Sequence, residues 1–135
     1  MNDRVDQVLV NHDKGYNCAQ AVACAYADLY HVGEAEAFRA MEAFGRGMGA
    51  MTTCGAVSAM TYLVGLKLSD VNLDKPKSKA VCYKIATNML NAFKEKNQST
   101  ECRELKGVGT GIMLRTCDGC MEDAARIVEE YLLND

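Results

Sequence analysis

Apolar residues recur every three or four positions along most of the chain, which is the spacing of one face of an α-helix. Between residues 77 and 96, for example, Cys82, Ala86, Met89 and Phe93 are separated by four, three and four positions. The same reading predicts helices over residues 3–12, 18–30, 34–44, 54–66, 77–96, 100–106 and 117–133. Residues 61–68 are the weakest of these assignments, because their β-branched and aromatic side chains also suit a strand.

The composition fits this helical pattern. The chain has one proline and no tryptophan, and 49% of its 135 residues are hydrophobic, which is enough for one domain to bury a core. We therefore expect an all-α fold, a compact bundle of about six to seven helices in a single domain over residues 1–135.

An uncharged segment, residues 47–66, is as long as a membrane span. Four glycines, three threonines and a serine interrupt it, and its first half has the composition of a loop. We interpret it as a glycine loop leading into a helix buried at the centre of the bundle.

The charge pattern excludes two classes of partner. The formal net charge is -3, and acidic and basic residues are interspersed, so we expect binding neither to nucleic acid nor to membranes. The opening MNDRVDQVLV lacks the features of a signal peptide, which favours a cytoplasmic protein.

Seven cysteines are many for this length, and in a reducing compartment they are more often metal ligands or redox centres than disulfides. Cys24 and Cys82 lie inside predicted helices and are interpreted as small buried side chains. The other five lie at predicted helix starts, where the helix dipole and free N–H groups lower thiol pKa values. These five are Cys18, Cys54, Cys102, Cys117 and Cys120.

Side-chain direction suggests that these thiols converge. Cys18 and Cys117 each share an apolar helical stripe, so both are predicted to face the bundle. Alternate glycines precede Cys54 and Cys117 and allow close approach of the backbone. The hypothesis is a single interior site at which several helix starts meet.

Other motifs in the sequence are weaker indications of function. The Cys117-Asp118-Gly119-Cys120 segment is a C-x-x-C motif, but no histidine follows it, which excludes a c-type haem attachment site. The glycines at 45, 47 and 49 follow no predicted strand, so nucleotide binding is not expected. His12 and His31 are interpreted as solvated residues near helix ends.

Five sequence blocks, GYNCAQAV, FGRGMG, TCGAVSAM, ECRELKG and TCDGCMEDAARIVEEYL, together resemble a family of redox-active proteins named for its C-GCAxxG-C-C cysteine pattern. The similarity covers residues 5–132. It implies that Cys18, Cys54, Cys102 and Cys117 are the four defining cysteines and that Cys120 is an addition. A similar pattern in split-Soret cytochromes is associated with an iron-sulfur cluster, and the family's setting implies an oxidoreductase or electron carrier as partner.

Three functions follow as hypotheses. In the first, Cys18, Cys54, Cys102 and Cys117 bind an iron-sulfur cluster or another thiolate-ligated metal, such as zinc, for electron transfer or redox sensing, with Cys120 also in contact with the cofactor. In the second, a metal-free thiol-disulfide oxidoreductase or redox sensor uses Cys54 or Cys117 as its attacking thiol. The third is a structural helical module. The sequence leaves open whether the chain forms a homodimer.

Overall fold

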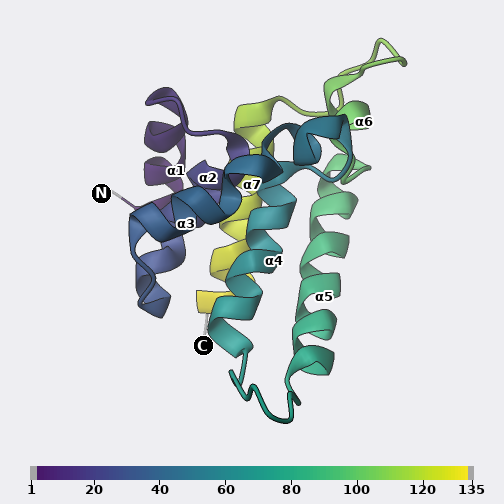
Figure 1. Ribbon diagram of the computed structural model, residues 1–135. Coiled ribbons are helices and arrows are strands. Elements are labelled where there is room, and N and C mark those ends of the chain that lie inside the picture. The colour runs from purple at the N-terminus through teal and green to yellow at the C-terminus, as the bar shows by residue number, and fades with distance from the viewer. Residues whose placement is uncertain (1–2, 134–135) are drawn as a thin grey trace.

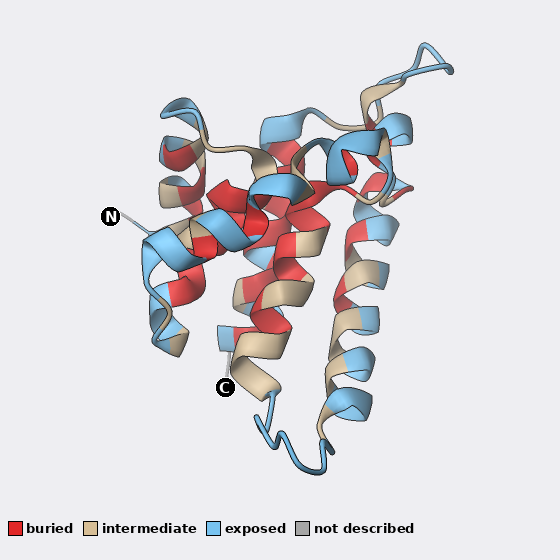
Figure 2. Cartoon of the chain, in the orientation of Figure 1, coloured by how far each residue is buried: buried red, intermediate tan, exposed pale blue. Residues whose placement is uncertain are grey.

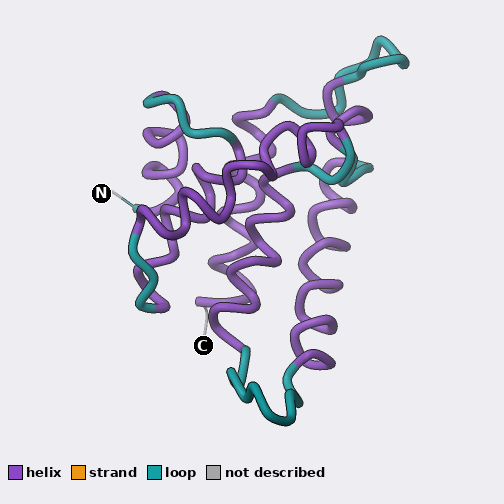
Figure 3. Tube along the Cα trace, in the orientation of Figure 1, coloured by secondary structure: helices purple, strands orange, loops and turns teal. Residues whose placement is uncertain are grey.

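The computed structural model describes residues 3–133, and this part of the chain folds into α-helices joined by loops (Figures 1 and 3). Residues 1–2 and 134–135 of the predicted domain lie outside the described residues. The α-helices are α1 (Arg4–Asp13), α2 (Cys18–Tyr26), α3 (Glu34–Met41), α4 (Gly55–Leu68), α5 (Lys79–Asn97), α6 (Cys102–Lys106) and α7 (Cys117–Val128). The all-α prediction is confirmed.

Short turns extend three of these helices and precede a fourth. The 3₁₀ turns Ala27–Tyr30 and Glu42–Phe44 continue α2 and α3, and the wider turn Glu129–Leu133 continues α7. A tight turn at Gly47–Met51 comes before α4. Within residues 3–133 the extended structure amounts to one isolated antiparallel bridge, between Thr53 and Glu101.

Helix α4 lies at the centre of the bundle, as predicted. It packs against α2, α5 and α7, and none of its residues is exposed (Figure 2). Residues 61–68 are its C-terminal half and not a strand, because contacts with three neighbouring helices outweigh their local strand preference. No helix in the described part of the chain has the length and apolarity that crossing a bilayer requires.

The hydrophobic core joins α1, α2, α4, α5 and α7. Its largest fully buried side chains include Tyr26, Met60, Leu63, Phe93 and Met121. Two cysteines that were expected inside helices, Cys24 and Cys82, are only half-buried.

The bundle has two distinct ends. Helices α2, α4, α6 and α7 all begin at the upper end in Figure 1, whereas the connection between α4 and α5 lies at the lower end. We call the upper end the thiol end, because five cysteines lie there.

Candidate functional site: a cysteine-lined cavity

The thiol end contains a cavity of about 330 Å³ that the five helix-start cysteines line together. Its lining consists of His12, Asn17, Cys18, Arg46, Cys54, Gly55, Cys102, Leu105, Lys106, Arg115, Cys117 and Cys120. The structure therefore brings together every cysteine that was predicted at the site, and Cys24 and Cys82 lie outside it.

Cys18 is the first residue of α2 and packs against the start of α4. Asn17 and Gln20 cap α2 reciprocally through a capping box, which fixes where the helix begins. A Cβ atom at Gly55 would lie 2.5 Å from the Cys18 Sγ, closer than two such atoms can approach. Glycine at position 55 therefore allows the Cys18 sulfur to pack directly against the backbone of α4.

Cys54 and Cys102 are joined through their backbones by the isolated bridge. The N–H of Cys54 donates to the carbonyl oxygen of Thr100 at 2.8 Å, and the N–H of Cys102 donates to that of Thr52 at 2.6 Å. Both thiols are buried, with 6% of each residue exposed. This pair of hydrogen bonds fixes the start of α4 beside the start of α6.

The turn before α4 has a left-handed backbone that is unusual for side-chain-bearing residues. Arg46, Met48 and Met51 have φ values of 57°, 60° and 60°, and glycines at 47 and 49 share this conformation. Each non-glycine residue with this left-handed backbone lowers the folding stability by on the order of 1–3 kcal/mol. A hydrogen bond from the Thr52 N–H to the Gly47 carbonyl, 3.0 Å long, closes the turn. The turn places Arg46 in the cavity wall.

The two cysteines of the C-x-x-C motif have different environments. Thr116 caps α7 by accepting the N–H of Gly119 at 2.9 Å. Cys120 is buried, whereas Cys117 is exposed. The prediction that Cys117 is turned away from water is wrong: Cys117 lines the cavity but is exposed, whereas Cys120, three residues later, is buried.

Cys54 has the most reactive electrostatic environment among the thiols with a resolved pKa shift. A hydrogen bond from the Cys120 thiol, supported by the N–H groups of Ala56 and Val57, lowers the pKa of Cys54 to about 7. The same interaction raises the pKa of Cys120, because Cys120 keeps the shared proton. Near pH 7 the Cys54 thiol is thus partly ionised, while Cys120 stays protonated as the donor.

The expected lowering of pKa at helix starts does not hold for Cys18 or Cys102. Burial raises the pKa of both thiols, although the N–H of Arg46 partly opposes this for Cys18 and the Lys106 ammonium does so for Cys102. At these two positions the loss of hydration raises the thiol pKa by more than the helix N-terminus lowers it. Negative charge at Cys54 or Cys117 also raises the pKa values of Cys18, Cys102 and Cys120, which indicates that these thiols lie close together.

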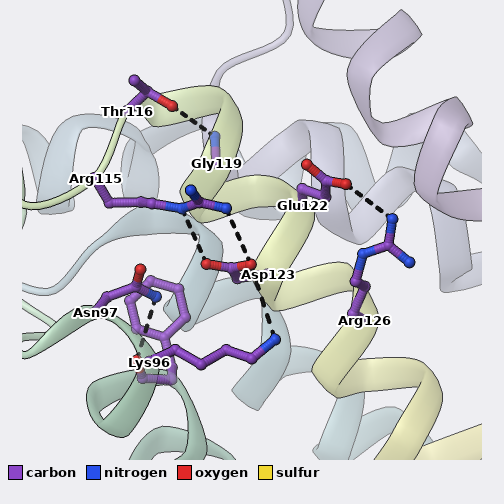
Figure 4. A network of polar contacts seen from close by, with 9 residues as sticks. Lys96, Asn97, Arg115, Thr116, Gly119, Glu122, Asp123 and Arg126 are labelled. Carbon is purple, nitrogen blue, oxygen red and sulfur yellow. Dashed lines mark hydrogen bonds and ion pairs between the residues drawn. The ribbon is translucent and has the colours of Figure 1, made fainter.

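Basic residues form part of the cavity wall: Arg46, Lys106 and Arg115 were not predicted there, and His12, predicted to be solvated, also lines the cavity. Arg115 donates to both carboxylate oxygens of Asp123, from Nε at 3.1 Å and Nη2 at 3.3 Å (Figure 4). Gly119 leaves room for this guanidinium, since a Cβ there would overlap it. His12 pairs with Asp118 at 3.3 Å. Arg46, Lys106 and Arg115 stand close to cysteines in the sequence, in the segments GRG, LKG and LRTC. This closeness is the sequence signal that could have identified them.

The donor set suits a group that uses several thiolates. Within residues 3–133, no three or more His, Cys, Asp or Glu side chains are already arranged around a point that one metal ion could occupy. In an iron-sulfur cluster the thiolates bind separate irons, so they need not surround a single point. In the described residues the five thiols thus line one cavity without forming a preformed single-ion site.

Comparison with known proteins gives one match. The model of the family described as "Putative redox-active protein (C_GCAxxG_C_C)" matches residues 16–131. Neither the curated proteins nor the solved structures include a match to the chain. Since the matched region contains all five cavity cysteines and most of the sequence, the chain belongs to the C_GCAxxG_C_C family of redox-active proteins.

Proposed function

We propose that this redox-active protein binds an iron-sulfur cluster through Cys18, Cys54, Cys102 and Cys117 and transfers electrons or senses redox state with it. The observation that carries the proposal is the convergence of thiols from four helix starts on one cavity. Such a cluster would supply one-electron chemistry at a potential set by its charge, hydrogen bonds and exposure.

The chain's own groups favour negative charge at Cys54 and partly oppose the effect of burial at Cys102. The Lys106 ammonium lowers the pKa of Cys54 and opposes the rise at Cys102, and Arg46 also acts on Cys102. N–H groups of Ala56 and Val57 stabilise a thiolate at Cys54. These interactions favour a thiolate ligand at Cys54 inside a largely buried site.

Cys120 is best explained as a partner of a ligand. Its thiol donates to the Cys54 sulfur, and hydrogen bonds of this kind to a ligating sulfur tune both the basicity of the ligand and the reduction potential.

Cys117 is exposed, so one side of the site reaches the surface, where an oxidoreductase or electron carrier could exchange electrons. Because all seven cysteines are free thiols, we place the protein in a reducing compartment, the cytoplasm.

The direct test is anaerobic purification of the full chain, followed by visible spectroscopy and by iron, sulfide and zinc analysis. We expect a coloured protein with stoichiometric iron and sulfide. Cys18→Ser, Cys54→Ser, Cys102→Ser and Cys117→Ser should each reduce the iron content, whereas the matched controls Cys24→Ser and Cys82→Ser should retain it. A colourless protein without iron, or one that contains only zinc, would contradict the proposal.

The Cys54 and Cys120 contact favours a second candidate, a metal-free thiol-disulfide couple. In that reaction Cys54 attacks a disulfide substrate, one substrate thiolate leaves, and Cys120 then displaces the other to give a Cys54-Cys120 disulfide. The substrate gains two electrons and the protein loses two. A metal-free protein that forms this disulfide reversibly, with one fast-reacting thiol, would make this candidate the better one.

A further inference from the structure

The wall of the cysteine-lined cavity is basic, although the chain as a whole is acidic. Arg46, Lys106, Arg115 and His12 line it, and its lining includes no aspartate or glutamate. The formal net charge of the whole sequence is -3. Cations in a concave site that contains no carboxylate attract anionic ligands.

Two of these basic groups are not neutralised by a carboxylate. Within the described chain, Arg46 and Lys106 take part in none of the ion pairs. Arg115 is paired with Asp123, but a guanidinium has five N–H donors and this pair uses only two of its nitrogen atoms. Arg115 therefore retains donors while Asp123, itself only 8% exposed, fixes its position.

The cavity has the size of a small-molecule site. Ligand pockets in proteins span about 300–1,000 Å³, so 330 Å³ corresponds to a ligand of few atoms. Two arginines match the geometry of oxyanions, because a guanidinium can donate two parallel hydrogen bonds to one oxyanion group. Lys106 adds a point charge in the lining of the same cavity as Cys54 and Cys102.

We propose that this cavity binds a small divalent oxyanion beside the thiols, held by Arg46, Lys106 and Arg115. The inference rests on the proposed function in one respect: if the thiols carry the redox centre, its substrate is a small anionic molecule bound in the same cavity. The competing explanation is that the basic groups only balance the charge of the thiolates.

Titration calorimetry on the reduced full chain, kept anaerobic, tests the inference with two probes. Sulfate represents a tetrahedral dianion and succinate a dicarboxylate, and chloride at equal ionic strength is the control for screening. We expect one saturable site for at least one dianion and none for chloride. Arg46→Gln and Lys106→Gln should each weaken binding about tenfold, the effect of one lost charge-assisted hydrogen bond.

Two further variants make the result specific. Lys106→Arg should preserve binding, and Arg126→Gln should leave it unchanged, because Arg126 pairs with Glu122 on α7 outside the cavity lining (Figure 4). The absence of saturable binding for both dianions would overturn the inference. So would unchanged affinity in Arg46→Gln and Lys106→Gln accompanied by a raised pKa of Cys54, which would show that the cations serve the thiolates alone.

Iron analysis of the same samples separates this inference from the proposed function. Dianion binding to a protein without iron supports the anion site and rejects the cluster. Iron without dianion binding supports the cluster and rejects the anion site.

Discussion

Glycines at the two ends of the bundle meet different surroundings. At the thiol end, a Cβ at Gly45 would lie 2.5 Å from the Asn17 side chain, and one at Gly55 would lie 2.5 Å from the Cys18 Sγ. At the lower end of α4, a Cβ at Gly65 would meet nothing within 4 Å. Close approach of other groups to the backbone is therefore required at the start of α4 and not near its end.

The two halves of α5 differ in how far their side chains are buried. Its C-terminal half buries Met89, Phe93 and Asn97 near the thiol end, whereas residues 79–88 include no buried side chain (Figure 2). Tyr83, in that first half, is 66% exposed. The tight packing that positions the cysteines is thus concentrated at one end of the molecule.

The largest effect is expected from removing a core side chain next to the thiol end. Phe93→Ala should destabilise the protein by about 3–5 kcal/mol, because a fully buried aromatic ring leaves a cavity. Tyr83→Ala, on the exposed half of the same helix, should change stability by less than about 0.5 kcal/mol. Urea denaturation measures both, and equal losses would contradict the contrast between the two halves.

A methyl group at the start of α4 should have the next largest effect. Gly55→Ala should cost about 1–3 kcal/mol through overpacking against the Cys18 sulfur and the Phe44 carbonyl oxygen. Urea denaturation gives the stability, and the alkylation rate of Cys18 shows whether its thiol has moved. A variant as stable as the parent, with Cys18 equally protected, would show that this contact is not close.

The reactivity of Cys54 should depend on Cys120. Cys120→Ala removes the hydrogen bond that contributes most to holding the pKa of Cys54 at about 7, so this pKa should rise towards the ordinary thiol value. The thiolate fraction at pH 7 then falls, and alkylation of Cys54 should slow about tenfold. The pH dependence of alkylation in the metal-free protein measures this. Cys82→Ala is the matched control, and a similar slowing there would remove the specific role of Cys120.

The smallest effect should be a gain in stability at the lower end. Gly65→Ala places a methyl group in open space inside a helix and should stabilise the protein by about 0.5–1 kcal/mol, because glycine loses more backbone entropy on folding. Thermal or urea denaturation detects this gain. A loss of stability would mean that the lower end is packed as tightly as the thiol end.

Helical periodicity was sufficient to predict the architecture, because each helix buries a face defined by residues three and four apart. The helix starts at Cys18 and Cys117 also have a local cause, since Asn17 and Thr116, the residues just before them, cap α2 and α7. These features depend on residues close in sequence. The convergence of the cysteines was predicted from the same local signals.

Features that depend on contacts between distant segments could not be predicted in this way. The Thr53 and Glu101 bridge, the Cys54 and Cys120 hydrogen bond and the basic cavity wall all join residues far apart in the chain. The pKa values of Cys18 and Cys102 rise because of burial, which helix-start position alone does not reveal. The exposure of Cys117 likewise depends on how α7 sits against its neighbours.

The bridge between Thr53 and Glu101 has a consequence for engineering the chain. The bridge joins a residue just before the start of α4 to a residue after the end of α5, at the end of the two helices where the cavity lies. The connection between α4 and α5 lies at their other end, away from the cavity. Residues 69–77 of that connection are exposed, and lengthening a surface loop adds little closure entropy. A peptide tag, a fused domain or new chain termini could therefore be introduced there while the cysteines keep their register.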